Sequence, residues 1–190
     1  MGLIVLIAVV AVLVIVVIAV IGIYNGLIRA RLRVEEAWSQ IDVQLKRRHD
    51  LIPNLVNAVR GYMGFEQDTL TAVTNARAAA VAAGAQGPAA AAAAENQLTQ
   101  TLRSLFAVVE NYPELKANQN VLSLQEQLTT TENQISFSRQ HYNATVLDYN
   151  NGIQTVPNNV FAGMFGFTRR DFFDAEPEAA NVPKVDLSLS

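Results

Sequence analysis

Two histidines, His49 and His141, are the side chains of this chain best suited to acid–base or metal chemistry. Neither lies in an HExxH or ExxH pair, and no P-loop, GxGxxG or GxSxG motif occurs. Cysteine is absent, which excludes disulfides, thiol catalysis and thiolate metal sites. The residues therefore predict a protein that is not an enzyme and holds no metal or cofactor, with His49 solvated or capping a kink and His141 on a helical surface. A deep pocket with two or more titratable groups would favour an enzyme instead.

The densest run of charge is Lys46, Arg47, Arg48 and His49. One interpretation is a solvated helix face paired with neighbouring acidic residues. The other is a docking patch for an acidic partner or for lipid headgroups. Trp38, the single tryptophan, likewise allows two roles, as a core anchor or as the centre of a partner interface.

These residues lie in a segment, 26–62, whose apolar side chains recur at steps of three and four and so predict an amphipathic helix. Arg48 interrupts this apolar stripe once. Pro53 either kinks the helix or begins a new one capped by Asp50, and the unbroken phase of the stripe favours the kink. The stripe consists of Val34, Trp38, Ile41, Leu45, Ile52, Leu55, Val59 and Tyr62.

Three further helical patterns follow, and strand patterns are nearly absent. The apolar pattern breaks at 63–69, then Gly84, Gly87 and Pro88 separate one helix from the next, which covers 89–112. Asn118 can cap the last helix. That helix carries two heptad series, one apolar (Val121, Leu128, Ile135, Tyr142 and Tyr149) and one mostly small or polar (Leu124, Thr131, Ser138, Thr145 and Gly152).

The fold class is therefore all-α, with an antiparallel up-and-down bundle behind the first segment. A single helix over 26–83 would leave a long apolar stripe without a partner, so the chain must reverse within 48–66. We favour a reversal at 63–66, which gives four helices of comparable length. A reversal at 50–53 is the alternative, and three helices with a kinked first helix also remain open.

The segment Leu3–Ile23 has no charge and no proline, and at about 1.5 Å per residue it is long enough for a hydrocarbon core of about 30 Å. A cleaved signal peptide would need a basic start, which Met1 and Gly2 do not supply. Basic residues follow the span and none precedes it, which predicts a single-pass membrane protein with its N-terminus outside and the rest in the cytoplasm. We expect an anchor over 1–28, a helical bundle over 29–155 and a tail over 156–190.

An even number of antiparallel helices returns the chain to the membrane, so the tail VFAGMFGFTRRDFF begins beside the bilayer. Aromatic and arginine side chains together are typical of an interfacial segment. The alternative is that the rings fold back over the end of the bundle. Residues expected at the membrane interface are Tyr24, Arg29, Arg31, Arg33, Phe161, Phe165, Phe167, Arg169, Arg170, Phe172 and Phe173. Residues 174–190 have the composition of a flexible end.

The net charge is −3, and it is unevenly distributed. Residues 29–60 carry seven basic and four acidic side chains, whereas 61–190 carry seven basic and thirteen acidic ones. The basic end suits anionic lipid, and the acidic remainder argues against nucleic acid as a partner. The alanine tract is either a close-packed or solvated hairpin tip or a small-residue surface for self-association.

Several stretches of this chain resemble the LemA family: RVEEAWSQIDVQLKRRHDLIPNLVNAVRGY (33–62), the FE…AVTNARAAA run, SRQHYNATVLDYNNGIQTVP (138–157) and the end GFTRRDFFDAE…NVPKV. The resemblance departs at Phe65, at Val156 and in the longer alanine tract. It implies a membrane-anchored, mostly cytoplasmic helical bundle without known enzymatic activity. Members of the family are linked to bacterial cell-envelope functions and, in one branch, to magnetosome membranes.

We therefore expect a structural scaffold that self-associates in the membrane plane through the spanning helix and small-residue surfaces, and that organises or shapes the bilayer. Membrane lipid and further copies of the chain are its expected partners. The alternative is an adaptor that docks a second membrane protein, such as a membrane protease, through the 46–49 patch or the tail.

Overall fold

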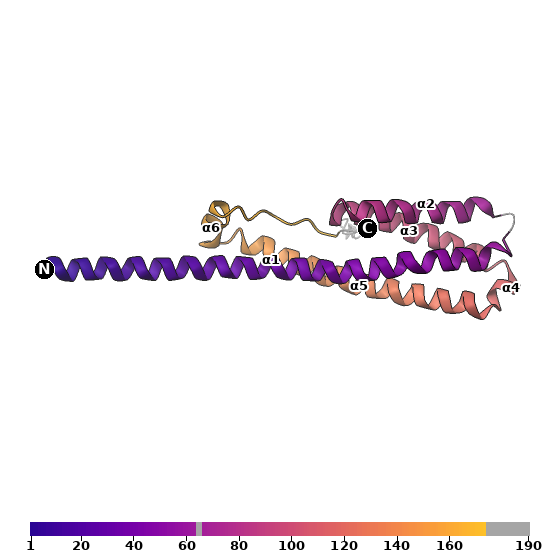
Figure 1. Ribbon diagram of the computed structural model, residues 1–190, viewed down its shortest axis with the longest axis horizontal. Helices are drawn as coiled ribbons and strands as arrows, with labels where there is room; N and C mark the ends of the chain where they lie inside the picture. Colours follow the sequence, from indigo (N-terminus) through magenta and orange to yellow (C-terminus); the bar gives the residue numbers. More distant parts are fainter. Residues whose placement is uncertain (64–65, 174–190) are drawn as a thin grey trace, which may run out of the picture. The chain divides into compact units, whose positions relative to one another are not determined.

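The computed structural model describes residues 1–63 and 66–173, and within them the chain is helical without a strand. The elements are α1 (Gly2–Arg60), α2 (Gln67–Gly84), α3 (Pro88–Val109), α4 (Pro113–Lys116), α5 (Gln119–Gly152) and α6 (Asn158–Met164), as Figure 1 shows. The all-α prediction is confirmed. The flexible end expected over 174–190 lies outside the described residues.

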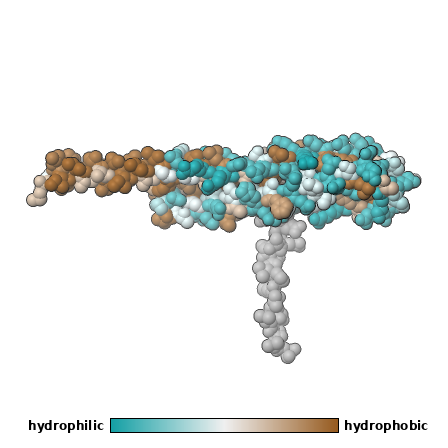
Figure 2. Space-filling model, turned by 90° about the horizontal axis from the view of Figure 1, so that it is seen from below, coloured by the Kyte–Doolittle hydropathy of each residue, from teal (hydrophilic) through white to brown (hydrophobic). Residues whose placement is uncertain are grey.

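The N-terminal part of α1 exposes apolar side chains on all sides. Residues 1–19 are all exposed, and Figure 2 shows this segment as hydrophobic along its visible face. By length and composition it is the one candidate membrane span among the described residues. Leu27, at 4% exposure, is the first buried residue. The helix has no break near residue 28, so the apolar segment and the amphipathic segment are one continuous helix.

The same helix runs through Pro53 and ends at Arg60, so Asp50 does not cap a new helix. The next helix begins at Gln67, so the chain reverses between α1 and α2, as the favoured prediction had it, and not at 50–53. Gly87 and Pro88 also lie, as expected, where one helix is followed by the next. Gly87 has a φ of +110°, a conformation that side chains with a Cβ rarely adopt, and Pro88 is the first residue of α3.

The described chain forms two compact units. The second unit, residues 44–135 with 172–173, is a four-helix bundle made of the end of α1, α2, α3 and the start of α5. Its core brings together residues that the sequence pattern assigned to separate stripes, among them Leu55, Val59, Val73, Leu105 and Leu128. The helices differ in full length, because α2 and α3 have 18 and 22 residues against 34 in α5, while the 59 residues of α1 also include the apolar segment.

The first unit contains the part of α1 up to Val43, the part of α5 from Ser136, and α6 with the chain up to Asp171. Asn118 caps α5 as expected, because its Oδ1 accepts hydrogen bonds from the backbone N–H groups of Asn120 and Val121 at 3.0 and 3.4 Å. All five residues of the apolar heptad series of α5 are buried. The chain then returns along α1 within this unit, as an even number of antiparallel helices requires.

Candidate functional site

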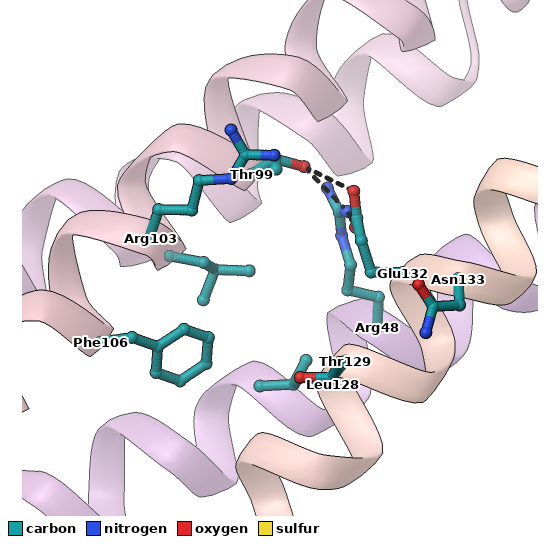
Figure 3. A pocket seen from close by; sticks show the side chains of 9 residues that line it. Arg48, Thr99, Arg103, Phe106, Leu128, Thr129, Glu132 and Asn133 are labelled. Atoms are coloured by element: carbon teal, nitrogen blue, oxygen red, sulfur yellow. Dashed lines mark hydrogen bonds and ion pairs between the residues drawn. The ribbon is translucent and has the colours of Figure 1, made fainter.

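A buried cluster of charges lies in the four-helix bundle. The Arg48 guanidinium donates from Nη2 to Glu95 Oε2 at 2.6 Å and to the Glu95 carbonyl oxygen at 2.9 Å. Its Nη1 donates to Thr99 Oγ1 at 3.0 Å and also binds a Glu132 carboxylate oxygen, so the group lies between α3 and α5 (Figure 3). His49 Nε2 is 2.6 Å from the other oxygen of Glu95. Three helices are thus joined by one guanidinium and two carboxylates.

Burial explains why these groups bind one another. Arg48 is 2% exposed and Glu95 is 4% exposed. A charge removed from water to that extent is tolerated only where an opposite charge and hydrogen bonds replace the lost hydration. The planar fork of arginine can reach two acceptors at once, which a lysine cannot do in the same geometry.

The expectation of a docking patch over 46–49 is therefore wrong for two of its four residues. Lys46 and Arg47 are exposed, but Arg48 and His49 point into the bundle and have no surface for a partner. The interpretation of His49 as a solvated or kink-capping side chain is also wrong, since its imidazole is bound to Glu95. His141 is exposed, as expected.

Arg77 resolves the problem that Pro53 creates in the backbone of α1. A proline has no N–H, so the carbonyl four residues earlier, that of His49, loses its helical hydrogen bond. Arg77 Nε of α2 donates to this carbonyl oxygen at 2.6 Å. The helix therefore continues through Pro53 with its orphaned carbonyl satisfied by a neighbouring helix.

Replacing Arg77 with alanine is expected to cost about 1 to 3 kcal/mol of unfolding free energy, because a partly buried carbonyl loses its charged donor. In a Pro53→Ala background the cost is expected to be smaller, since the new N–H of residue 53 can bind the His49 carbonyl. The parent protein, the two single variants and the double variant form a cycle. Their urea denaturation in micelles, followed by helical circular dichroism, gives the coupling energy between residues 53 and 77. Equal costs in both backgrounds would contradict this role for Arg77.

A pocket of about 190 Å³ opens beside the charge cluster. Leu102, Phe106 and Leu128 give it an apolar lining, and its charged side chains are Arg48, Arg103 and Glu132 (Figure 3). Glu132 is the one carboxylate of this lining, and it is bound to the Arg48 guanidinium. Within residues 1–63 and 66–173, no three His, Asp or Glu side chains are placed to hold a metal ion.

The second site is in the other unit, where three α5 side chains hold the chain that follows α6. Asn150 makes two hydrogen bonds of 2.9 Å with the backbone of Arg170, one to its N–H and one to its carbonyl. Tyr149 Oη donates to the Thr168 carbonyl at 3.0 Å, and Tyr142 Oη donates to the Asp171 carbonyl at 2.8 Å. We call Tyr142, Tyr149 and Asn150 the tail clamp.

Aromatic rings connect the same tail to α1. The Tyr24 ring is edge-on to Phe165 at 5.0 Å and to Phe167 at 5.9 Å between centroids. The Arg31 guanidinium lies 5.7 Å from the centre of the Phe167 ring, within the range of a cation–π contact. We call Tyr24, Arg31, Phe165 and Phe167 the aromatic collar.

The expected membrane-interface residues divide into three groups by exposure. Phe167 and Phe173 are buried, so the expectation of lipid contact is wrong for these two rings. Phe161 and Arg31 are partly buried. The remaining residues are exposed: Tyr24, Arg29, Arg33, Phe165, Arg169, Arg170 and Phe172.

Two further side chains have partners that the sequence pattern does not show. Arg170 binds Glu35 at 3.2 Å on the surface of the first unit. Trp38 is half-buried and packs against the Tyr142 ring at 5.7 Å, which favours its interpretation as a core anchor.

Replacing Asn150 with alanine is expected to lower the free energy of unfolding by about 1 to 3 kcal/mol. The reason is that the N–H and the carbonyl of Arg170 lose the buried amide that binds both of them. Asn151→Ala is the matched control, since that side chain is exposed on the same helix. Limited digestion with trypsin should cleave the Asn150 variant after Arg169 and Arg170 faster than it cleaves the control. Unchanged cleavage at Arg169 and Arg170 would show that the clamp does not hold the tail.

Burial raises the pKa of Tyr142 from 10.0 to about 12, although the charge of Arg170 lowers it and that of Asp171 raises it. Burial also raises the pKa of Tyr149. Between pH 10 and 12 the folded state keeps a proton on Tyr142 that the unfolded state releases, so stability is expected to fall as the pH rises through this window. Denaturation at stepped pH checks this, and Tyr142→Phe should flatten the fall.

An apolar helix long enough to span a membrane continues into a helical bundle with a buried cluster of ion pairs, which defines a membrane-associated helical protein. The profile of the LemA family matches residues 37–187, and the chain belongs to this family. Magnetosome protein MamQ 2 of Paramagnetospirillum magneticum is 26% identical over 190 residues, covering 87% of this chain and 70% of the relative.

Two other relatives match to a similar extent. Magnetosome protein MamQ of Magnetospirillum gryphiswaldense is 24% identical, covering 85% of this chain and 68% of the relative. Protein LemA of Metamycoplasma hominis is 25% identical, covering 89% of this chain and 75% of the relative. The names of these proteins do not indicate enzymes.

Proposed function

We propose that this protein is a non-enzymatic scaffold, anchored in the bacterial inner membrane, that self-associates in the membrane plane and organises or shapes the bilayer. The observation that carries the proposal is the N-terminal part of α1, where residues 1–19 are exposed and nearly all apolar. Such a surface is favourable only in lipid or against other protein. The same helix continues without a break into the residues of the first unit.

The proposed orientation places the N-terminus outside and the rest in the cytoplasm. Arg29 and Arg33 are exposed directly after the apolar segment, where cytoplasmic flanks carry basic residues. Self-association is supported by small side chains that face solvent on α2, among them Ala72, Ala79 and Ala82. Relatives named as magnetosome proteins support a role in organising a membrane.

The test is cysteine crosslinking in native membranes. The chain has no cysteine of its own, so every disulfide it forms must involve the introduced thiol. Ala79→Cys places a thiol on the exposed face of α2, and Ala80→Cys places one in the core as a matched control. The scaffold predicts disulfide-linked copies of the chain from Ala79→Cys and none from Ala80→Cys. Protein that sediments as a monomer in detergent, at concentrations where membrane assemblies persist, would contradict it.

The second proposal is an adaptor for another membrane protein, and the exposed Lys46 and Arg47 favour it. Two neighbouring cations on a helix surface can dock an acidic partner. A photoreactive group at Arg47 should then give one dominant adduct with a foreign protein. Adducts between copies of the chain at this position support the scaffold instead.

A further inference from the structure

We propose that α6 is a second membrane-contact element, which inserts its exposed apolar side chains into the interfacial zone of an anionic lipid leaflet beside the point where α1 leaves the bilayer. This inference rests on the membrane anchoring proposed above. The contacting segment is α6, its contacting side chains are Val160 and Met164, and its depth is that of Tyr24 on α1.

The apolar face of α6 and its flanks is exposed to an unusual degree. Val156 is 82% exposed, Val160 is 60% exposed and Met164 is 73% exposed. Val160 and Met164 are four residues apart and therefore lie on one face of the helix. Ala162 is 3% exposed and marks the face that packs against protein. Val160 and Met164 thus form an exposed apolar edge on a helix whose Ala162 faces protein, and such an edge suits contact with an apolar phase.

The position of α6 along α1 identifies that phase. Phe165 directly follows α6 and contacts the ring of Tyr24 at 5.0 Å between centroids. Tyr24 follows the last residue of the apolar segment, Ile23, and both partners belong to the same unit. Figure 1 shows α6 alongside α1, next to the end of α5. The exposed apolar face therefore lies at the depth where the spanning helix reaches the headgroups.

The charges at this level match an anionic surface. Arg29 and Arg33 are exposed on α1 within the first turns after Tyr24, and Arg169 is exposed just beyond the aromatic collar. Arginine side chains can keep their stems in the apolar zone and place their guanidinium groups at phosphates. The nearby Glu35 is bound to Arg170, at 3.2 Å, so it adds little repulsion of its own.

The geometry of α6 is fixed at both ends. Asn158 Nδ2 donates to the Gly152 carbonyl at 3.1 Å at its start. At its end Gly166 has a φ of +70°, and the Phe167 N–H binds the Ala162 carbonyl at 2.9 Å, which is the hydrogen bond of a Schellman cap. The tail clamp then holds Thr168 to Asp171. The element is thus preorganised, and little ordering cost remains when it meets lipid.

The test uses the full chain reconstituted in vesicles of phosphatidylglycerol and phosphatidylcholine, with an environment-sensitive fluorophore on single cysteines. Val160→Cys and Met164→Cys report on α6, and Val12→Cys reports on the anchor. Ser39→Cys is the matched water-exposed control, fifteen residues past Tyr24 and about 22 Å along the same helix. Nitroxides placed near the headgroup and deep in the acyl chain act as quenchers.

We expect the shallow nitroxide to quench the fluorophore at 160 and 164 several-fold more than at 39, and the deep nitroxide to quench position 12. If positions 160 and 164 match position 39 while position 12 is quenched, the α6 inference is overturned and the anchor stands. If position 12 is not quenched, the anchor itself fails. Equal quenching at 160 in vesicles of phosphatidylcholine alone would overturn the requirement for an anionic surface. Unchanged Trp38 fluorescence in each variant shows that the first unit has kept its fold.

Discussion

Replacing Glu95 with alanine is expected to lower the free energy of unfolding by about 3 to 5 kcal/mol, because it leaves a buried guanidinium without its closest buried carboxylate. The substitution removes the carboxylate that binds both Arg48 and His49. Arg48, at 2% exposure, would then be a buried cation that relies mainly on Glu132. Urea denaturation in micelles, followed by helical circular dichroism, measures the loss.

Glu132→Ala is the matched control, because its side chain is 44% exposed although it binds the same guanidinium. Solvent can replace much of what an exposed carboxylate contributes, so the loss should be clearly smaller. A double variant, Arg48→Met with Glu95→Leu, should recover part of the stability that Glu95→Ala loses, since it leaves no buried cation without a partner and the Glu132 carboxylate is 44% exposed to water. Equal losses for Glu95→Ala and Glu132→Ala would show that burial does not determine the strength of this cluster.

Replacing Leu55 with alanine is expected to cost about 2 to 5 kcal/mol. This side chain is 0% exposed and belongs to the core cluster that α1, α2, α3 and α5 share. Its truncation removes apolar contact area and leaves a cavity that a close-packed bundle fills only in part. The same denaturation experiment measures it.

Leu122→Ala is the control for the core, because Leu122 is 41% exposed on α5 in the same unit. The two variants remove the same atoms and differ only in burial, so Leu122→Ala should stay within about 0.5 kcal/mol of the parent protein. A small loss for Leu55→Ala would mean that α1 does not contribute its stripe to the bundle core in solution.

Much of the fold follows from local patterns of the sequence. The heptad series from Val121 to Tyr149 predicted the buried face of α5, because a repeat of seven returns to nearly the same side of a helix. The position of Gly87 and Pro88 predicted the start of α3, since glycine readily adopts a positive φ and proline is favoured in a first helical turn.

The ion pair between Arg48 and Glu95 was not predicted, because the pattern of a single helix does not show which residue of another helix it will meet. Arg48 lies in phase with the apolar stripe of α1, and Glu95 lies in phase with Ala91, Leu98 and Leu102 on α3. Two opposite charges, each on the buried face of its own helix, are the signal that these helices bind each other through an ion pair. Which pair of helices brings the charges together depends on tertiary packing, and periodicity does not contain that information.

The tail was predicted only in part for a similar reason. The sequence placed aromatic and arginine side chains near the membrane, but the tail clamp binds the backbone of residues 168–171 and not their side chains. Backbone carbonyls are the same in every residue type, so composition cannot show which ones a tyrosine or an asparagine will bind. The bound backbone decides which phenylalanines are buried and which stay exposed.

The absence of any joint in α1 between Gly2 and Val43 has a mechanical consequence. A continuous helix bends only gently, so with the apolar segment placed in lipid as proposed, a tilt of the helix at Val14 would also reorient Trp38 and the Tyr142 ring packed on it. Changes in bilayer thickness or curvature would in this way be converted into angular displacement of the first unit.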